Sequence, residues 1–543
     1  MGSILGIFNI GQQALLAEQT ALSVTSQNIS NVNTPGYSRQ SVVFETAAAG
    51  IDGGGVQADQ IQRMVNQFID NQVTAEQSSL GQYTVEQNVL NQIQSVFSDL
   101  QGSGINQALS DFFASLQDLA NNPTGFTERA AVLAKAQSLA QQFNSTSSQL
   151  QQLRKDLNGQ IQTDLGTVNT LAQQIADLNH QISQAETLGQ SPNALLDQRG
   201  QLLNQLSNLV SINTFQDSQG QTTVMVAGQP LVEGSTAHAL QGTANPDNGG
   251  LVKIQFDTGG GTLTDLSGAI TGGQLKGLLD LRDTVVPGYL DQVDKLAANV
   301  VNGVNQLQQS GYGLDGSTGL DFFQPLAPTA TALSANTGSA TVTASVSDPT
   351  QLTFDNYQLS FSGGNYTILN LTTGSSTSGA YGGAMAVTFE GLNVTIGAGA
   401  ASGDVFAISA HQGEAGAMAT AITDPNQIAA SASAAGVPGD NSNVLQMAGL
   451  QNQTMTSLGG TTLQNYYGSM VGAIGSSVQQ AQSNLSAQQT VQQQLDAMRQ
   501  STSGVSLDQE MTNLIMYQRA YQAAAKLITV ADQVYQTLLN MTQ

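Results

Sequence analysis

Both ends of this 543-residue chain carry apolar residues at a seven-residue repeat, and this feature constrains the fold more than any other. Near the N-terminus, one apolar stripe has alternating gaps of three and four residues: Ile7, Ile10, Ala14, Ala17, Ala21 and Val24. Beside it, four large apolar residues recur every seven positions: Phe8, Leu15, Leu22 and Ile29. Near the C-terminus, gaps of three and four residues separate Leu514, Tyr517, Tyr521, Ala524, Ile528, Ala531, Tyr535 and Leu538. Such repeats line up along one face of a helix, as in coiled coils. We therefore predict a coiled-coil helix at each end.

Neither terminal helix is expected to fold in isolation. A few large side chains bury too little surface to offset the backbone entropy lost in ordering so long a helix. Each stripe must be covered by the other end of the chain or by a neighbouring subunit. We predict a terminal domain of residues 1–60 plus 500–543 that is disordered in the monomer and ordered in an assembly.

After the N-terminal segment, the sequence continues with a series of helical patterns. Helical periodicity is predicted from Gln57 to Leu100, with shorter helices over 106–120 and 127–144. Apolar residues from Leu150 to Ile182 then recur at gaps of three and four, which favours a long internal bundle helix. We predict a helical bundle domain built from three separate pieces, 61–210, 285–310 and 426–499.

Two regions have the character of β-structure. Residues 211–284 contain short apolar runs such as "TTVMVAG" and "LVKIQF" between glycine clusters, which predict a small β-rich domain. Residues 327–410 are rich in Gly, Ser and Thr, with alternating pieces such as "YQLSF" and "LNVTIG", and predict an all-β domain inserted between helical segments. The predicted fold class is α+β and multidomain, with discontinuous coiled-coil and bundle domains built from both termini and β-rich domains inserted between them.

The first helix is expected to end in the stretch "NISNVNTPGYSRQ", residues 28–40. Within it, Thr34-Pro35-Gly36-Tyr37 fits a type II turn, with proline at the second position and glycine supplying positive φ at the third. On physical grounds alone, the stretch is a helix stop followed by a tight turn.

Composition excludes several classes of partner. Only 10% of the residues are charged and the net charge is −24, so phosphate backbones and anionic membrane surfaces would be repelled. No stretch approaches the length of a membrane-spanning helix. Residues 1–10, "MGSILGIFNI", lack the basic region and the long apolar run of a secretory signal. We expect no nucleic-acid partner, no membrane partner and no cleaved signal peptide.

The sequence contains no arrangement typical of catalysis. There is no cysteine, and the three histidines, His180, His238 and His411, are far apart and lack metal-ligand spacing. Neither a Walker A loop nor a GxSxG motif occurs. We predict no catalytic, cofactor-binding or metal-binding residues, and therefore no enzyme.

Both ends of the chain resemble a known family. "ALSVTSQNISNVNTPGYSRQ" is similar to the N-terminal signature shared by flagellar rod, hook and hook-associated proteins, and its "YSRQ" ending is closest to the hook-associated proteins of the first hook–filament junction layer. "GVSLDQEMTNLIMYQRAYQAAAKLITVADQVYQTLL" is similar to the C-terminal signature of this family. "GSGINQALSDFFASLQDLANNP" and "GDVFAI" resemble further stretches of it.

The resemblance implies a structural adaptor that joins the hook to the filament of the bacterial flagellum. Its implied partners are the hook protein, the second junction protein, other copies of itself and a cytoplasmic export chaperone at its C-terminal region. The implied location is extracellular, reached by type III export, with the terminal helices lining an inner tube. The implied assembly residues lie in the two terminal segments and are Phe8, Leu15, Leu22, Ile29, Asn28, Asn31, Thr34, Pro35, Gly36, Tyr37, Arg39, Leu514, Tyr517, Tyr521, Ile528, Tyr535 and Leu538.

Two alternatives stay open at this point. A hook or rod subunit of the same family shares part of the signatures, although such chains are usually richer in β-structure and lack the long helix over 149–188. A secreted adhesin or glycan-active protein would act through the β insertion, but that insertion has no histidine and few aromatic residues to stack on sugars.

Overall fold

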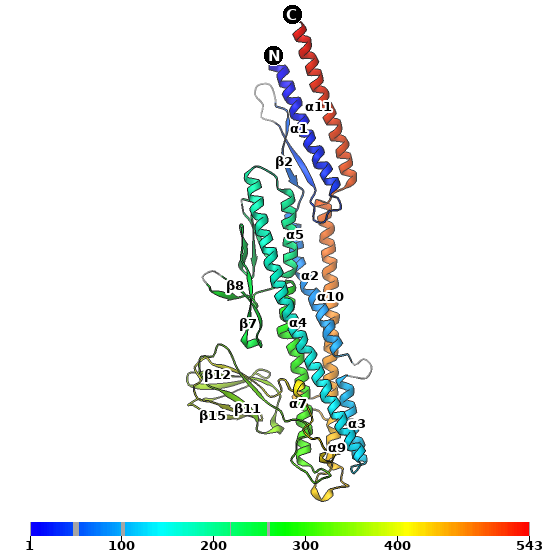
Figure 1. Cartoon of the computed structure of the whole chain (residues 1–543), viewed down its shortest axis with the longest axis vertical. Coiled ribbons are helices and arrows are strands. Elements are labelled where there is room, and N and C mark those ends of the chain that lie inside the picture. Colours follow the sequence, from blue (N-terminus) through cyan, green and yellow to red (C-terminus); the bar gives the residue numbers. More distant parts are fainter. Residues whose placement is uncertain (1, 47–53, 99–103, 218, 258–260, 542–543) are drawn as a thin grey trace.

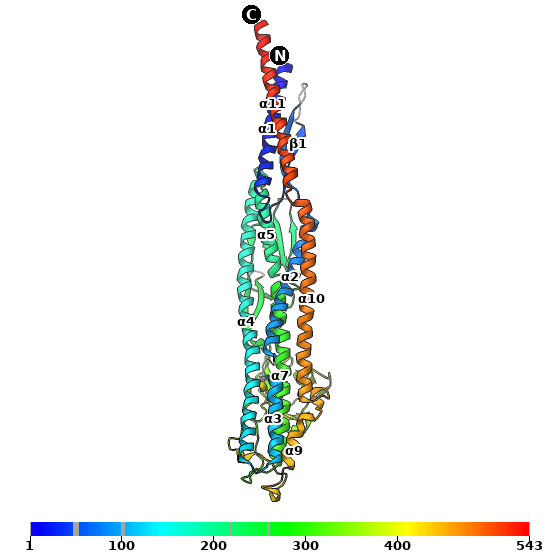
Figure 2. The same ribbon diagram turned by 90° about the vertical axis from the view of Figure 1, so that its right-hand side faces the viewer.

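The terminal helices stand together at one extremity of an elongated molecule, above a long helical stem from which β-sheets project (Figure 1). A second view shows that the stem helices run nearly parallel to the long axis (Figure 2). The structure is a computed structural model, and it describes residues 2–46, 54–98, 104–217, 219–257 and 261–541.

The terminal pair consists of α1 (Gly2–Ser30) and α11 (Leu507–Met541), which confirms the helix predicted at each end. The two helices are antiparallel and pack against each other along their length, so both chain ends lie at the same extremity (Figure 1). A hairpin of β1 (Gln40–Thr46) and β2 (Val56–Arg63) packs beside α1. The helical pattern predicted from Gln57 is wrong over β2, because this segment instead pairs its backbone with β1.

The stem is made of helices from three separate parts of the sequence. Helix α4 is a single helix of 62 residues, where the sequence predicted two. The polar stretch between the two predicted helices contains no proline or glycine, and Asn144, just before it, donates hydrogen bonds to the carbonyls of Ala415 and Met418. The stem and the segments joined to it contain these helices: α2 (Gln67–Val96), α3 (Ile105–Asn121), α4 (Phe126–Thr187), α5 (Asn193–Leu209), α6 (Gly273–Asp280), α7 (Val286–Ser310), α8 (Glu414–Ala417), α9 (Ser442–Gly449) and α10 (Leu463–Ser503). A π-helical turn, Leu281–Val285, joins α6 to α7.

One continuous hydrophobic core runs through the stem and the sheets packed on α4. Within it Phe112 contacts three other fully buried rings, Phe113, Phe322 and Phe323, at centroid distances of 5.3–5.9 Å, and the rings of Phe322 and Phe323 are 4.9 Å apart. The stem therefore has a dense core, which it shares with those sheets.

Two small antiparallel sheets lie along α4. Their orders are β3-β4-β5-β6 and β7-β8-β9. The strands are β3 (Asn213–Gln216), β4 (Thr222–Val226), β5 (Gln229–Glu233), β6 (Thr236–Ala237), β7 (Leu240–Asn245), β8 (Leu251–Asp257) and β9 (Leu263–Asp265).

The outer part of the molecule is an all-β unit that projects from the lower stem (Figure 1). Its sheets have the orders β10-β17-β12-β13-β14 and β11-β16-β15, and they share a separate core that includes Leu359, Val394 and Phe406. The strands are β10 (Thr329–Ala332), β11 (Val342–Val346), β12 (Asn356–Ser362), β13 (Asn365–Asn370), β14 (Ser376–Ala380), β15 (Met385–Phe389), β16 (Leu392–Ile396) and β17 (Val405–Ser409). Long helices from both ends with sheets between them confirm the predicted α+β multidomain class.

Candidate assembly site at the base of the terminal helices

A single corner connects the terminal pair to the stem. The end of α1, the open ends of β1 and β2, the turn from α10 to α11 and the first turn of α5 all meet there. The segment from Asn28 to Gln40, which the sequence singled out, lies at the centre of this corner.

Asn28 ties three elements together through one buried side chain, which is 1% exposed. Its Nδ2 donates to the carbonyl of Gln40 (2.8 Å) and to Oε2 of Glu510 in the first turn of α11 (3.1 Å). Its Oδ1 accepts from the Tyr37 hydroxyl (2.8 Å) and from the backbone N–H of Gln40 (3.0 Å). Two donors and two acceptor sites are all that an asparagine amide offers, so the side chain is fully satisfied.

Arg39 contacts both the end of α10 and the start of α11. Its backbone N–H donates to the carbonyl of Ser503 at the end of α10 (2.8 Å), and its carbonyl accepts from Met64 N–H after β2 (2.8 Å). Its guanidinium donates from Nη1 to Gln509 (2.9 Å), and Nε lies 3.5 Å from Glu510. One residue thus fixes where the final helix leaves the stem.

The corner is anchored to α5 by polar contacts with Asp197. One carboxylate oxygen accepts from the backbone N–H of Ser38 (3.1 Å), and the other pairs with Arg63 at the end of β2 (2.8 Å). Close by, Asn193 donates to the side chain of Gln40 (3.2 Å) and to the carbonyl of Ile61 (2.9 Å). These contacts hold the terminal pair at a fixed position above the stem.

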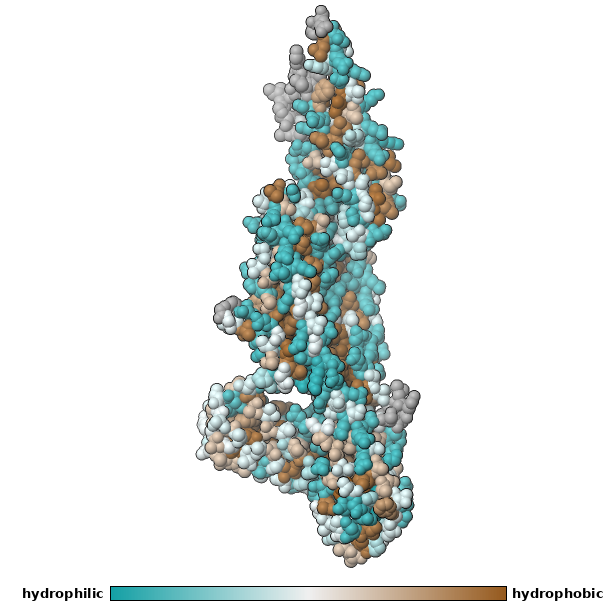
Figure 3. All heavy atoms as spheres, in the orientation of Figure 1, coloured by the Kyte–Doolittle hydropathy of each residue, from teal (hydrophilic) through white to brown (hydrophobic). Residues whose placement is uncertain are grey.

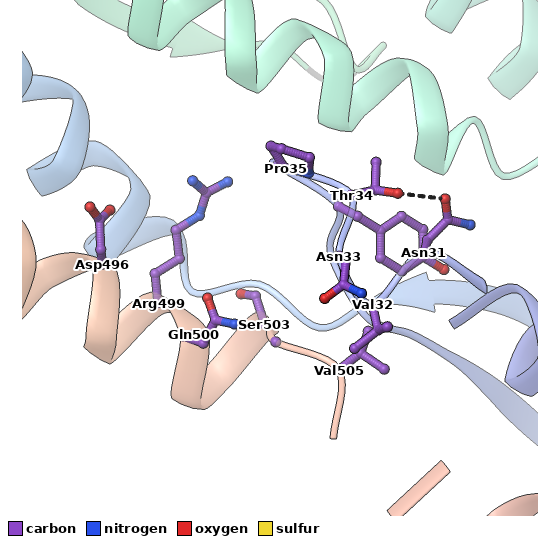
Figure 4. Close-up of a pocket in the computed structure, with 13 residues that line it drawn as sticks. Asn31, Val32, Asn33, Thr34, Pro35, Asp496, Arg499, Gln500, Ser503 and Val505 are labelled. Carbon is purple, nitrogen blue, oxygen red and sulfur yellow. Dashed lines mark hydrogen bonds between the residues drawn. The ribbon is translucent and has the colours of Figure 1, made fainter. Parts of the chain in front are cut away.

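The predicted turn forms between Thr34 and Tyr37. Gly36 has φ of +77°, and the Tyr37 N–H donates to the Thr34 carbonyl (3.2 Å), as expected for a type II turn. The Pro35 carbonyl accepts a hydrogen bond from Gln201 of α5. Across a cleft of about 460 Å³, this loop faces the last turns of α10 (Figure 4).

Tyr37 stays protonated throughout the physiological pH range. Burial raises the pKa of its hydroxyl to about 12, and the negative charges of Asp197 and Glu510 act in the same direction. The hydroxyl therefore remains a hydrogen-bond donor to Asn28.

The predicted heptad residues lie in the terminal pair, but small residues form its buried seam. On α1 the buried apolar side chains are Ala17, Ala21 and Val24 of the stripe with gaps of three and four, whereas the seven-residue series Phe8, Leu15, Leu22 and Ile29 is half-buried. On α11 only Ala524 and Ala531 of the predicted series are buried. Half-buried members of that series are Leu514, Tyr517 and Ile528, and exposed members are Tyr521, Tyr535 and Leu538.

A second apolar stripe on α11 was not predicted. It consists of Met516, Val530, Val534 and Met541, which are 46–78% exposed; we call it the outer stripe. Val530 follows Ile528 by two residues, so at 3.6 residues per turn the two side chains point to nearly opposite sides of the helix. Figure 3 shows hydrophobic residues on the surface of the terminal pair.

Sequence reasoning also missed Gly11, Glu510 and Asp197. A side chain at Gly11 would meet Ile528, since a Cβ there would lie 2.7 Å from its Cγ1. A glycine inside an apolar helical pattern is a signal of such close packing. Glu510 and Asp197 gave no comparable signal. Glu510 lies 482 positions from its partner Asn28, and Asp197 lies 159 positions from its partner Ser38.

Two further observations concern metal binding and membrane-spanning helices. No group of three or more His, Cys, Asp or Glu side chains suited to a metal ion occurs among the described residues. Within the same residues, no helix is long and apolar enough to cross a membrane.

The chain matches several protein-family models. Residues 90–323 match the family described as flagellar hook-associated protein FlgK helical domain, and residues 331–410 match flagellar hook-associated protein 1, D2-like domain. The ends match broader families: residues 8–37 match flagella basal body rod protein, and residues 498–541 match flagellar basal body rod FlgEFG protein C-terminal.

Whole-length relatives carry the same description. Flagellar hook-associated protein 1 of Salmonella typhimurium is 31% identical, with 98% of this chain and 99% of the relative covered. The protein of the same name from Bacillus subtilis is 28% identical, with 97% and 96% covered. Among solved structures, the flagellar hook junction protein FlgK from Burkholderia pseudomallei aligns with a TM-score of 0.70 at 24% identity, over 80% of this chain and 100% of that one, which shows a shared fold.

Proposed function

We infer the role of this chain from one premise, namely that it belongs to the flagellar hook-associated protein 1 family. It is a structural component of the extracellular bacterial flagellum that acts at the junction of hook and filament. Members of this family assemble with hook and junction proteins in the axial structure. The matches of residues 90–323 and 331–410 to hook-associated families argue against a rod or hook subunit and against an adhesin.

We propose that the chain acts without catalysis, as an adaptor layer between the hook protein and the second junction protein. Its terminal helices contact neighbouring copies in an inner tube, and the corner around Asn28 and Arg39 sets the position of those helices above the stem. Before assembly a cytoplasmic chaperone holds the C-terminal region, and export takes place without a cleaved signal peptide.

The observation that carries the proposal is the outer stripe on α11. Its large side chains are exposed on a helix whose seam with α1 buries mainly alanines. Large exposed apolar faces mark contact surfaces in soluble proteins. The predicted inner series, including Leu514 and Ile528, serves to hold α1 and α11 together, and the outer stripe serves to join one copy to the next.

We propose a division of the chain that follows from these roles. Residues 1–60 plus 500–543 form the terminal coiled-coil domain, and 61–210 plus 285–310 plus 426–499 form the bundle domain. Residues 211–284 form a small β-rich domain that shares its core with the stem and ends in α6, and residues 327–410 form the outer all-β domain. The separate core of the outer β unit supports its treatment as an independent domain.

The decisive experiment compares two charged substitutions on adjacent residues of α11. Val530→Asp places a carboxylate in the outer stripe, and Thr529→Asp places the same charge on another side of the helix, where the side chain is also exposed. We expect Val530→Asp to abolish filament attachment and motility while the monomer stays folded, and Thr529→Asp to leave both intact. Normal filaments in the Val530→Asp strain would contradict the proposal.

A second test concerns the seam. Leu514→Asp and Ile528→Asp should separate α1 from α11 and abolish assembly, with the stem and β domains still folded. Limited proteolysis of the wild-type monomer should remove roughly the first 50 and last 40 residues first, because weakly packed termini are cleaved before a dense core. A monomer that resists cleavage at both ends would count against termini that are completed only by assembly.

A further inference from the structure

The outer β unit shares little apolar surface with the rest of the molecule. It has a core of its own, and among the described residues Ala298 of α7 is the one buried member of that core that comes from the stem. The half-buried Leu326, where the chain enters the unit, packs against both cores. Domains joined by little buried apolar area are free to move relative to each other. The outer β unit is therefore fastened to the stem mainly by other contacts.

The two ends of the outer β unit lie side by side. The chain enters through β10 and leaves through β17, and these strands pair with Thr329 opposite Ser409. Beside this pair, Thr329 Oγ1 donates to Gln412 Oε1 (3.3 Å), and the exit segment ends at Gly413, which has φ of +83°. Entry and exit therefore meet at one place, which is the geometry of a single hinge.

The main contact with the stem is a row of side chains along one face of α7. They follow one another at gaps of three and four residues, so they lie on the same side of the helix: Asp291, Lys295, Ala298, Asn302 and Gln306. Nearest the hinge, Asp291 Oδ1 accepts from Asn356 of β12 (2.8 Å) and lies 2.9 Å from Nε2 of His411. Lys295 lies 3.4 Å from Asp355. Four of the five side chains are polar, so the row acts through hydrogen bonds and charge.

The far end of this row leaves the outer β unit some freedom. Asn302 and Gln306, one turn apart on α7, both donate to the carbonyl of Pro349 (3.0 and 3.2 Å). Because two donors share one acceptor, the carbonyl can shift along the helix and keep one hydrogen bond. This contact can follow a movement that would break a fixed pair.

A second contact holds the other end of β10. Ser334, two residues beyond this strand, donates its backbone N–H to Asp247 Oδ1 (2.5 Å) and its hydroxyl to Oδ2 (2.7 Å). Asp247 lies in the turn between β7 and β8, so this contact joins the outer β unit to one of the sheets along α4. Both residues are exposed, and water can replace either partner when the contact breaks.

An open cleft of about 640 Å³ separates the two contacts. Its lining reaches from Asn248 and Gly249, next to Asp247, to Asp291 and Asn356 at the α7 contact. Figure 3 shows an opening between the outer β unit and the stem. Unfilled space beside a hinge leaves room for rotation.

We propose that the outer β unit is a hinged arm, which rotates as a rigid body about its entry and exit segments, and that the contact between Asp247 and Ser334 is the latch that holds it in the position shown by the structure. Ser334 lies five residues beyond Thr329, so at about 3.3 Å per residue it is ~16 Å from the hinge. A rotation of roughly 15° would move it by about 4 Å, which breaks both hydrogen bonds. Asp291 lies next to the hinge and keeps its partners. This motion does not depend on the role proposed for α11.

The test measures the distance between stem and arm in the full-length protein. The chain has no cysteine, so spin labels attach only where cysteines are introduced. Gln162→Cys on α4 and Thr388→Cys on β15, both at exposed positions, form the label pair for double electron–electron resonance. We expect one main distance, and Asp247→Ala should raise the ratio of a second, displaced population to the main one about tenfold, the effect of losing a charge-assisted contact. An unchanged distance distribution in Asp247→Ala would overturn the proposal.

Matched variants show whether the effect belongs to the latch. Ser334→Ala removes the hydroxyl and keeps the backbone N–H, so the displaced population should rise less than in Asp247→Ala. Asp265→Ala removes an exposed carboxylate from the same sheet, where it accepts from Ser267 in its own turn, and should leave the distances unchanged. A rise in Asp265→Ala equal to that in Asp247→Ala would refute the latch.

A second label pair shows whether the arm moves as a rigid body. Gln162→Cys and Gln489→Cys, at exposed positions on α4 and α10, both lie in the stem and should give the same distance with and without Asp247→Ala. A changed stem distance would mean that the substitution disturbs the whole molecule, and the hinge would then be refuted.

Discussion

The stem and the terminal pair are both made of long helices, yet they are stabilised in different ways. The stem buries large side chains completely, among them Phe112, Phe143 and Ile175. The terminal pair buries alanines and one valine in its seam, and most of its large apolar residues remain half-buried or exposed. Because apolar stabilisation scales with buried area, the stem is self-sufficient while the pair depends on its corner and on further partners.

The corner compensates for the weak seam with polar contacts that are specific rather than extensive. Asn28, Arg39 and Glu510 bring together residues from opposite ends of the sequence. Fully satisfied buried polar groups favour one geometry, because any other arrangement leaves them without partners. The pair is therefore positioned accurately without being strongly stabilised, which suits helices that complete their packing on assembly.

The largest effect should come from a cavity in the stem. Phe112 is fully buried among three other rings, so Phe112→Ala should lower the free energy of unfolding by about 3–5 kcal/mol. Chemical denaturation followed by circular dichroism measures this loss. The control is Phe126→Ala at a ring that is 61% exposed, where a change of at most about 0.5 kcal/mol is expected. Equal losses at both sites would remove the basis of the comparison.

The next prediction concerns pH, which should change the stability of the stem region around Glu414 without affecting the terminal pair. Where α7 meets the outer β unit, burial raises the pKa of Asp294 from 3.8 to about 6 and that of Glu414 from 4.5 to about 7. Between pH 4 and 7 the folded chain retains protons that the unfolded chain releases, so the free energy of unfolding falls as pH rises. Below about pH 4, the folded and the unfolded chain both hold these protons, so the destabilisation caused by the two buried charges disappears.

Glu414→Gln removes one of these buried charges. At pH 8 it should raise the free energy of unfolding by on the order of 3 kcal/mol, because the pKa is raised from 4.5 to about 7 and each unit is worth about 1.4 kcal/mol, and at pH 4 it should change little. Glu233→Gln, at an exposed carboxylate, is the control and should have no such profile. Hydrogen exchange in α1 and α11 should show no dependence on this substitution, since Glu414 lies at the far end of the stem.

The third effect is confined to the terminal pair. Asn28→Ala removes the buried partners of the Gln40 N–H and carbonyl and one of the two partners of the Glu510 carboxylate, which keeps Arg39, and this should cost about 1–3 kcal/mol. Faster hydrogen exchange in α1 and α11, with the stem midpoint unchanged, is the expected result. Asn31→Ala, at a side chain that bonds only within its own loop and helix end, serves as control. A drop in the stem midpoint as large as that of Phe112→Ala would show that the two regions unfold as one.

The sequence predicted periodic features well and long-range polar ones poorly. Heptads predicted the helices that became α1 and α11, and Thr34–Tyr37 predicted the turn. The partners of Asn28 were invisible, because Glu510 lies 482 positions away and nothing local marks either residue as buried. The strand Val56–Arg63 was missed because its short alternation also fits a helical pattern until β1 supplies the backbone partners.

The outer stripe shows a different limit of sequence reasoning. A helix that is apolar on two sides satisfies a heptad in more than one register, so periodicity alone does not indicate which stripe meets α1. The predicted packing stripe was the series containing Leu514 and Ile528, and the exposed series containing Val530 was not predicted. Gly11, which brings α1 close to Ile528, is the residue that fixes the register in three dimensions.

The smallest effect tests whether the corner acts as one unit. Tyr37→Phe keeps the ring and removes the hydroxyl that donates to Asn28, so the pair should lose about 1 kcal/mol of local stability, visible as faster exchange in the last turns of α1. Tyr535→Phe, at an exposed ring near the C-terminus, should change nothing. In the background of Asn28→Ala the Tyr37 hydroxyl has already lost its acceptor, so the second substitution should add almost no further loss. Additive losses would mean that Tyr37 stabilises the corner independently of Asn28, and the corner would then be a set of separate contacts rather than one network.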